Sequence, residues 1–271
     1  MFRADLHCHT TLSDGTMTPL ELLLLAKEIG LSGISITDHD TIDAYIQAPA
    51  IAKELGLFLG SGVEFSCIFR TMSVHILGYD FDLNSPEIQH LCTRHQQRRS
   101  LRNKKILEKL SRLGMLIFEE ELMKVGEKTV GRPHIAQLMV QKGYVGSIRE
   151  AFNRFIGDGK PCFDAGEGIS VEETISIIHQ GGGKAFIAHP HLLKHANRIK
   201  ELFKLPFDGI ECHYAKFPAE QEARWIQISK ERGWLMSGGS DFHGSVKDYI
   251  QLGCSWVDET CFRKIFQHLI T

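Results

Sequence analysis

Histidines and carboxylates with ligand-like spacing lie near both ends of the 271-residue chain. His7 and His9 are two residues apart after the apolar start of the chain, and Asp241 and His243 repeat this spacing between glycines near its end. Residues two apart on a strand point to the same side. Because imidazoles and carboxylates are good ligands for zinc, manganese and iron, the two pairs predict a metal site.

Two further candidates follow other apolar segments. His39 stands in Thr37-Asp38-His39-Asp40, where packing explains three successive ionisable groups poorly, although a turn rich in Asp is an alternative. Glu64 ends a third apolar segment. At the carboxyl end of a parallel strand, this carboxylate would face the same site as His7 and His39.

Three candidates are ambiguous by themselves. Asp14 lies in a Ser-Asp-Gly turn, where such a side chain often only stabilises the backbone. His75 and His134 are each compatible with a buried, hydrogen-bonded histidine that binds nothing. Cys8 lies between two candidate ligands, and on a strand it would point to the opposite face, which favours a structural role over a nucleophile.

The surrounding sequence predicts an α/β fold in which strands alternate with helices at both ends of the chain. Thr18, Pro19 and Gly30 mark the start and end of the first helix. Strands are expected at 2–6, 34–37, 57–63, 185–188, 209–212, 234–237 and 252–257. Helices without intervening strands are expected at 87–113, 119–125, 133–142, 148–155 and 171–179. We therefore expect one catalytic domain, 1–271, with parallel strands and a mostly helical insertion at 86–178.

Composition limits the partners and the compartment. The net charge of −2 gives no general basic field, which favours small nucleotides or short oligonucleotides over long nucleic acids. Seven cysteines without paired spacing fit a reducing cytoplasm, and no signal segment is recognisable. No apolar run approaches the roughly 20 residues of a membrane span, and no obligate protein partner is indicated.

Six motifs, in order along almost the whole chain, resemble those of the polymerase and histidinol phosphatase (PHP) family. They are Asp5-Leu6-His7-Cys8-His9-Thr10, Thr37-Asp38-His39-Asp40, Gly62-Val63-Glu64, Gly131-Arg132-Pro133-His134, Ala188-His189-Pro190 and Ser240-Asp241-Phe242-His243. Within the family, the chain resembles the TrpH-like branch, which includes nucleoside 3′,5′-bisphosphate phosphatases and a 5′–3′ exoribonuclease.

The resemblance implies a distorted (β/α)7 barrel that binds divalent metal ions, three in number and of manganese, iron or zinc. It implies one metal at His7, His9, Glu64 and Asp241, a second at Glu64, His75 and His134, and a third at Asp14, His39 and His243.

The resemblance also implies residues that contact the substrate. Arg132 would clamp phosphate oxygens, although an ordinary surface arginine is the alternative. His189 would contact phosphate or donate a proton to the leaving group, with His191 and His213 as weaker candidates. Apart from the resemblance, the loop 157–161 is expected to lie beside the substrate, with Lys160 as its binding residue.

Two groups of residues have open roles. Asp38 and Asp40 flank His39 and are expected to orient imidazoles, with exposed turn carboxylates as the alternative. A basic run over 94–105 either is a solvated helix face or borders the site and attracts a second phosphate or an oligonucleotide backbone.

We therefore expect a metal-dependent phosphoesterase in which hydroxide formed at the metals attacks phosphorus in line. The favoured reaction removes the 3′-phosphate of nucleoside 3′,5′-bisphosphates. The alternatives are a 5′–3′ exoribonuclease on short 5′-phosphorylated RNA and, in another class, a non-catalytic metal-binding regulatory module.

Overall fold

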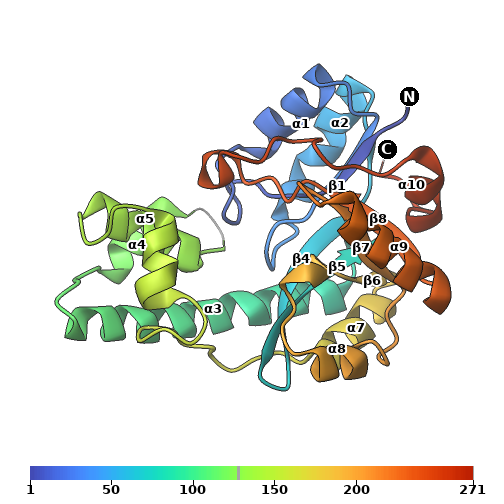
Figure 1. Cartoon of the computed structure of the whole chain (residues 1–271). Helices are drawn as coiled ribbons and strands as arrows, with labels where there is room; N and C mark the ends of the chain where they lie inside the picture. Colours follow the sequence, from blue (N-terminus) through green and yellow to red (C-terminus); the bar gives the residue numbers. More distant parts are fainter. Residues whose placement is uncertain (127–128, 271) are drawn as a thin grey trace.

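The strands form two sheets in the computed structural model, which describes residues 1–126 and 129–270. The first sheet is parallel and has the order β1 (Ala4–Cys8), β2 (Gly33–Ile36) and β3 (Phe58–Leu59). The second has the order β4 (Gly62–Phe69), β5 (Met72–Tyr79), β6 (Lys184–Ile187), β7 (Gly209–Tyr214) and β8 (Leu235–Gly239). The predicted α/β class is confirmed, and Figure 1 shows helices around both sheets.

The expectation that all strands are parallel is wrong. β5 is antiparallel to both β4 and β6, and only β6, β7 and β8 continue in parallel. β4 and β5 form a hairpin around Arg70, whose φ of 58° lies in the left-handed region. The hairpin turns the chain back on itself, so His75 approaches Glu64 from a neighbouring antiparallel strand.

Two predicted strands also differ from the observed ones. The segment 57–63 divides into β3 and the start of β4, because the chain leaves the first sheet at Gly60 and enters the second at Gly62. The segment 252–257 contains no strand and makes only an isolated bridge between Val257 and Ala4.

The two sheets meet at the ends of their strands. Isolated parallel bridges join His39 to Glu64 and Cys8 to Phe242, and the Asp241 N–H donates to the His7 carbonyl at 2.7 Å. These contacts bring residues from the start, middle and end of the chain to one place.

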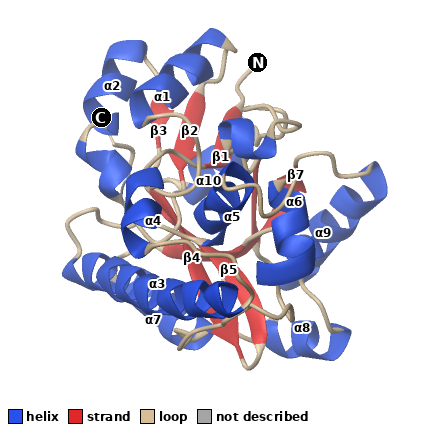
Figure 2. Ribbon diagram, turned by 90° about the vertical axis from the view of Figure 1, so that its left-hand side faces the viewer, coloured by secondary structure: helices blue, strands red, loops and turns tan. Residues whose placement is uncertain are grey.

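Helices cover the sheets at opposite ends of the molecule (Figure 2). The helices outside the central segment are α1 (Pro19–Glu28), α2 (Ala48–Leu55), α8 (Ala196–Leu202), α9 (Ala219–Arg232) and α10 (Glu259–Ile265), with the 3-10 turns η1 (Asp43–Ile46), η3 (Pro190–Leu192) and η4 (Gly244–Lys247). α1 begins as predicted, because Thr18 and Glu21 form a capping box and Pro19 is its first residue. None of the helices in 1–126 and 129–270 is long and apolar enough to span a membrane.

The central segment is helical, as predicted. It contains α3 (Pro86–Arg112), α4 (Glu119–Val125), α5 (Arg132–Gln141), α6 (Ile148–Ala151), the π-helix η2 (Phe152–Ile156) and α7 (Val171–Gln180). α3 joins two apolar cores: Ile88 and Leu91 pack in the core with β4, β5 and α7, whereas Ile106 and Leu110 pack with α4 to α6. Figure 1 shows α3 extending away from the sheets and carrying α4 and α5 at its far end.

Candidate metal centre and basic cavity

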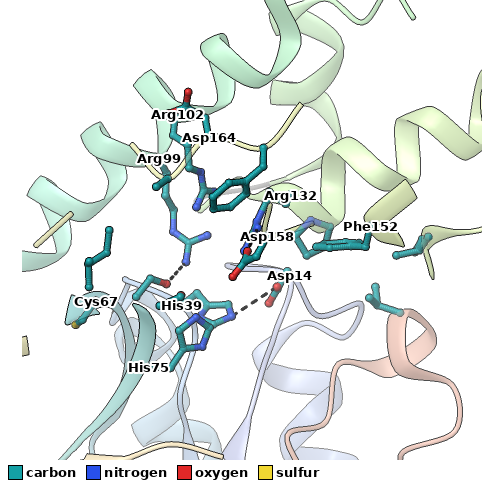
Figure 3. Close-up of a pocket in the computed structure, with 18 of the residues that line it drawn as sticks. Asp14, His39, Cys67, His75, Arg99, Arg102, Arg132, Phe152, Asp158 and Asp164 are labelled. Atoms are coloured by element: carbon teal, nitrogen blue, oxygen red, sulfur yellow. Dashed lines mark hydrogen bonds and ion pairs between the residues drawn. The ribbon is translucent and has the colours of Figure 1, made fainter. Parts of the chain in front are cut away.

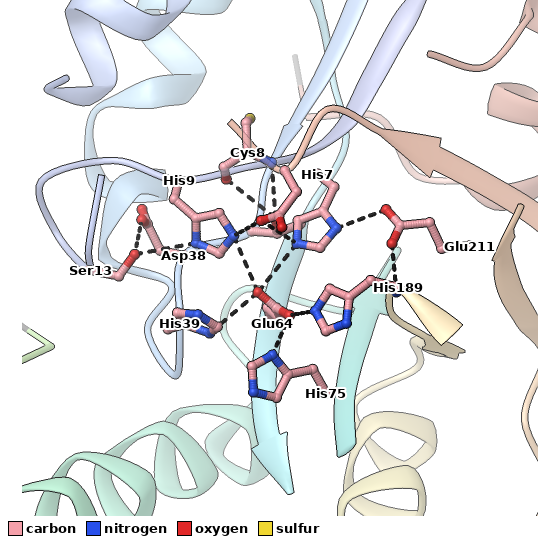
Figure 4. Close-up of polar contacts among 12 residues, drawn as sticks. His7, Cys8, His9, Ser13, Asp38, His39, Glu64, His75, His189 and Glu211 are labelled. Carbon is pink, nitrogen blue, oxygen red and sulfur yellow. Dashed lines mark hydrogen bonds and ion pairs between the residues drawn. The ribbon is translucent and has the colours of Figure 1, made fainter. Parts of the chain in front are cut away.

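Side chains from the strand ends converge on a buried cluster (Figure 4). Three overlapping groups have donor atoms close enough to share a metal ion. They are His7, His9, Glu64 and Asp241; His9, Asp14, His39 and His243; and His39, Glu64 and His75. The first group has the composition that the family resemblance implies for one metal.

Glu64 lies at the centre of the cluster. Its Oε2 is 3.2 Å from both His7 Nε2 and His9 Nε2 and 3.3 Å from His39 Nδ1. Its Oε1 is 2.7 Å from His75 Nδ1 and 2.8 Å from His189 Nε2. Although burial raises the pKa of Glu64, the surrounding histidines hold it well below its usual range. The ionised carboxylate therefore divides the cluster into an Oε2 side and an Oε1 side.

The donor set fits divalent metal ions. His9 Nε2 and His39 Nδ1 are buried without a hydrogen-bond partner, yet both point at carboxylate oxygens. Burial lowers the pKa of His9, but contacts with Asp241 and Glu64 outweigh burial and raise it to about 9. A cation among these groups would satisfy the unpartnered nitrogens and offset the buried negative charge.

Both carboxylate oxygens of Asp241 have partners. Oδ1 faces His7, His9 and His243 at 3.3 to 3.5 Å. Oδ2 accepts from Tyr214 Oη and from Lys247 Nζ, each at 2.6 Å. Lys247 therefore fixes Asp241 in position, and its side chain also lines the neighbouring cavity.

The aspartates beside His39 anchor backbone segments and α3, and Asp40 also faces the His95 imidazole of α3 at 3.3 Å. Asp38 accepts from the Thr10 N–H at 2.7 Å and from the Ser13 hydroxyl at 2.6 Å, which anchors the loop before Asp14. Asp40 accepts from the Ser66 N–H at 2.9 Å and from Arg99 Nε at 2.5 Å. The imidazole that Asp40 faces is therefore that of His95 and not of a candidate ligand, and the expected role in orienting the ligand imidazoles stays a prediction.

His134 and His189 occupy different positions from those expected. His134 is buried, accepts from the Gly131 N–H at 3.1 Å and belongs to none of the three groups. His189 instead reaches Glu64 Oε1 beside His75. His191 is half-buried against Tyr214 and Phe217, outside the cluster.

Glu211 is a site residue that the sequence reasoning did not identify. It is fully buried on β7, and its Oε1 lies 2.8 Å from His7 Nδ1. The available signal was a carboxylate between Ile210 and Cys212 in an apolar strand, because a buried strand rarely contains an unneeded charge.

A cavity of about 610 Å³ opens beside the cluster (Figure 3). Asp14, His39, His75 and His243 line one side. Five arginines also line the cavity, namely Arg98, Arg99, Arg102, Arg132 and Arg149, together with Phe152, Phe163, Asp158 and Asp164. The cavity thus joins metal-ligand chemistry to a basic and partly aromatic wall.

Arg98 and Arg102 are buried cations that form no ion pair with any carboxylate in 1–126 and 129–270. Their exposed fractions are 9% and 7%, and the described part of the chain places no carboxylate within ion-pair distance of either one. The Nε atoms of both lack a hydrogen-bond partner. Burial and the neighbouring guanidinium of Arg99 lower the pKa of Arg102 well below its usual range. Such a pair is suited to bind an anion.

The basic residues of the run 94–105 therefore lie on different faces of α3. Arg102 follows Arg98 and Arg99 by about one helical turn, and all three line the cavity. Arg94 instead pairs with Glu173, and Lys104 pairs with Glu119 at the surface.

The two other residues predicted to bind substrate, Arg132 and Lys160, differ in their position relative to the cavity. Arg132 begins α5 and lines the cavity, where its guanidinium contacts Asp158 at 2.6 Å and lies over the Phe163 ring at 5.2 Å. Lys160 is exposed and does not line the cavity, although Asp158 and Gly159 of the same loop do.

Known proteins of similar sequence and structure identify the family of the chain. The chain is 34% identical to a 5′–3′ exoribonuclease of Haemophilus influenzae, with 94% of this chain and 92% of the relative covered. It is 28% identical to a 3′,5′-nucleoside bisphosphate phosphatase of Chromobacterium violaceum, with 90% of this chain and 88% of the relative covered. A predicted metal-dependent phosphoesterase from Bifidobacterium adolescentis has a similar crystal structure, with a TM-score of 0.88, 30% identity and coverage of 97% and 94%. The model of the PHP domain matches residues 5–155, so the chain belongs to the PHP family of metal-dependent phosphoesterases.

Proposed function

We propose that the chain removes a phosphate from a small nucleotide that carries a second phosphate, with the 3′-phosphate of nucleoside 3′,5′-bisphosphates as the preferred target. One observation carries the proposal: a single cavity is lined by candidate metal ligands and by the unpaired Arg98 and Arg102. The first wall suits the scissile phosphate, and the second suits a phosphate that is retained.

The proposed metal assignment follows the observed contacts. His7, His9, Glu64 and Asp241 would hold one ion, and Asp14, His39 and His243 would hold another together with His9. Glu64 and His75 would hold a third ion with His189, which takes the place first expected for His134. Manganese, iron or zinc would supply a nucleophile from water near neutral pH and offset charge on the phosphoryl oxygens.

In this proposal the two sheets correspond to the distorted barrel, and 86–178 is an insertion in one catalytic domain.

Side chains that line the cavity beside the cluster would orient the substrate. Arg132 presents a planar guanidinium held between Asp158 and Phe163, so it can contact phosphate oxygens without a large loss of side-chain entropy. Lys247 would add positive charge at the cavity wall beside Asp241. The aromatic rings of Phe152 and Phe163 offer an apolar surface for a nucleoside.

A proton for the leaving oxygen would come from His189 Nε2, which now contacts Glu64, or from water. To donate this proton, the His189 imidazole would have to move away from Glu64 Oε1, which its Nε2 contacts at 2.8 Å. We favour water, because the same nitrogen is better placed as a metal ligand beside His75.

A 5′–3′ exoribonuclease on short 5′-phosphorylated RNA is the second candidate. The 34% identity to the Haemophilus influenzae exoribonuclease over most of both chains favours it. The two activities share one requirement, a terminal phosphate held apart from the bond that breaks, so the same basic wall would serve both.

The direct test is release of products by manganese-loaded protein from adenosine 3′,5′-bisphosphate, adenosine 3′-monophosphate and a 5′-phosphorylated RNA pentamer. Phosphate release that is at least tenfold more efficient from the bisphosphate than from the monophosphate supports the proposal. Sequential release of mononucleotides from the pentamer at a higher kcat/KM supports the exoribonuclease. No hydrolysis of any of the three by metal-loaded protein contradicts both.

A further inference from the structure

Glu211 contacts both sides of the cluster that Glu64 divides. Its Oε1 lies 2.8 Å from Nδ1 of His7, whose Nε2 faces Glu64 Oε2 at 3.2 Å. Its Oε2 accepts the backbone N–H of His189 at 2.7 Å, and His189 Nε2 faces Glu64 Oε1. Figure 4 shows Glu211 behind the two imidazoles, away from Glu64.

The burial of Glu211 calls for a compensating positive charge. The side chain is fully buried, and the described residues place no lysine or arginine within ion-pair distance of it. A buried carboxylate without a cation is strongly unfavourable. In the described part of the chain, its side-chain partner is the His7 imidazole, whose other nitrogen points into the candidate metal centre.

The contact to His189 acts on the backbone. His189 has φ 26° and ψ 63°, a conformation that residues with a side chain rarely adopt and that costs on the order of 1–3 kcal/mol. The bond from its N–H to Glu211 helps to hold this conformation, which aims the imidazole at Glu64.

We propose that Glu211 is a positioning residue that prepares two metal positions at once, an inference that rests on the metal-dependent function proposed above. It fixes His7 with the proton on Nδ1, which leaves Nε2 free as a ligand. Through the His189 backbone, it also holds the imidazole on the other side of Glu64. A merely structural role is the alternative, in which Glu211 only satisfies two buried N–H groups.

The substitution Glu211→Gln separates these roles because of hydrogen-bond direction. The His189 backbone N–H can only donate, so the amide oxygen of glutamine must face it. The amide NH2 then faces His7 Nδ1, which must accept, and the imidazole proton moves to Nε2. The variant therefore keeps the shape of the site but blocks the nitrogen that faces the metal position.

Glu222→Gln is a matched control. Glu222 contacts His213 Nδ1 at 2.5 Å, which is the same kind of carboxylate–imidazole contact as that of Glu211 with His7, but neither Glu222 nor His213 belongs to the metal groups. Each variant is compared with the unaltered protein by manganese titration in a calorimeter and by thermal unfolding of the metal-free form.

We expect Glu211→Gln to weaken manganese binding by about 10–100-fold, with little change in the metal-free Tm, and Glu222→Gln to bind as the unaltered protein does. Equal manganese affinity in Glu211→Gln and the unaltered protein overturns the inference, as does an equal loss in Glu222→Gln. If the unaltered protein binds no manganese, the proposed function itself fails. If Glu211→Gln does not fold, nitrogen-15 NMR of the zinc-loaded unaltered protein can show which ring nitrogen of His7 carries the proton. A proton on Nε2 contradicts the inference.

Discussion

Arg99 and Asp40 join the basic wall of the cavity to the candidate metal centre. Arg99 Nε on α3 donates to Asp40 Oδ2 at 2.5 Å, and Asp40 directly follows His39. Arg99 Nη2 also donates to the hydroxyl of Ser66, two residues beyond Glu64, at 2.7 Å. The helix that carries the arginines is therefore fixed directly to the segments that carry two candidate ligands.

Asp40→Asn should make stability less dependent on pH in the acid range. Although burial opposes it, Arg99 and His95 hold the pKa of Asp40 well below its usual range. A depressed carboxyl pKa contributes stability above the unfolded value of about 4, and this contribution is lost as pH falls towards the folded value. Between about pH 5 and pH 3, the metal-free unaltered protein should lose stability more steeply than Asp40→Asn.

Urea unfolding at several pH values measures this difference. Glu259→Gln is the control, because Glu259 pairs with Arg263 at the exposed surface of α10 and should leave the slope unchanged. Parallel curves for the unaltered protein and Asp40→Asn would show that the Asp40–Arg99 pair makes no net contribution to folding.

Arg102→Met should weaken substrate binding while leaving the fold intact or making it more stable. Removal of a charged contact to phosphate costs about 1.5–3 kcal/mol, equivalent to roughly 10–150-fold in KM for the bisphosphate. Replacement of a buried, unpaired cation by an apolar side chain of similar length should not lower Tm. Hydrolysis of adenosine 3′-monophosphate should be unaffected.

Lys104→Met, on the exposed face of the same helix, is the comparison for Arg102→Met. An equal rise in KM for both variants would indicate that only the general charge of α3 matters. A lower Tm for Arg102→Met would show that Arg102 is primarily structural.

His189→Ala and His134→Ala should differ in metal content. His189 contacts Glu64 beside His75, whereas His134 lies outside the metal groups. After dialysis against manganese, elemental analysis should find one ion fewer per chain in His189→Ala and an unchanged number in His134→Ala. The reverse pattern would restore His134 as the ligand that the family resemblance implies.

Gly239→Ala should destabilise the protein through the strand that carries His7. A Cβ at Gly239 would lie 2.3 Å from the His7 backbone nitrogen and 2.7 Å from Asp5 Oδ1. Overpacking of this kind costs about 1–3 kcal/mol in the free energy of unfolding. Gly146→Ala, whose Cβ would approach only the flexible Glu150 carboxylate, should leave the denaturation midpoint nearly unchanged.

The sequence predicted residues at strand ends better than the pairing of the strands. His7, His39 and Asp241 were found because polar side chains that follow apolar segments are conspicuous and meet where the strands end. The β4–β5 hairpin was not predicted, because Arg70 adopts its left-handed turn without the glycine that usually marks one.

Other features depend on contacts between residues far apart in the sequence, which no short motif can show. The motif around His134 does not specify how α5 approaches the cluster, so His134 was grouped with Glu64 in place of His189. Glu211 has no motif around it, and its importance follows from two contacts to residues 204 and 22 positions away. The orientation of the arginines on α3 depends on the packing of α3 against β4.

Metal-dependent hydrolysis centred on Glu64 is tested by phosphate release from adenosine 3′,5′-bisphosphate by chelator-treated protein, measured as manganese is added back, for the unaltered protein and Glu64→Gln. We expect no release without metal, recovery as manganese binds, and at least a thousandfold lower rate for Glu64→Gln at the same manganese concentration, because Glu64 contributes to both sides of the cluster. Undiminished release by the metal-free protein, or by Glu64→Gln, would contradict this expectation.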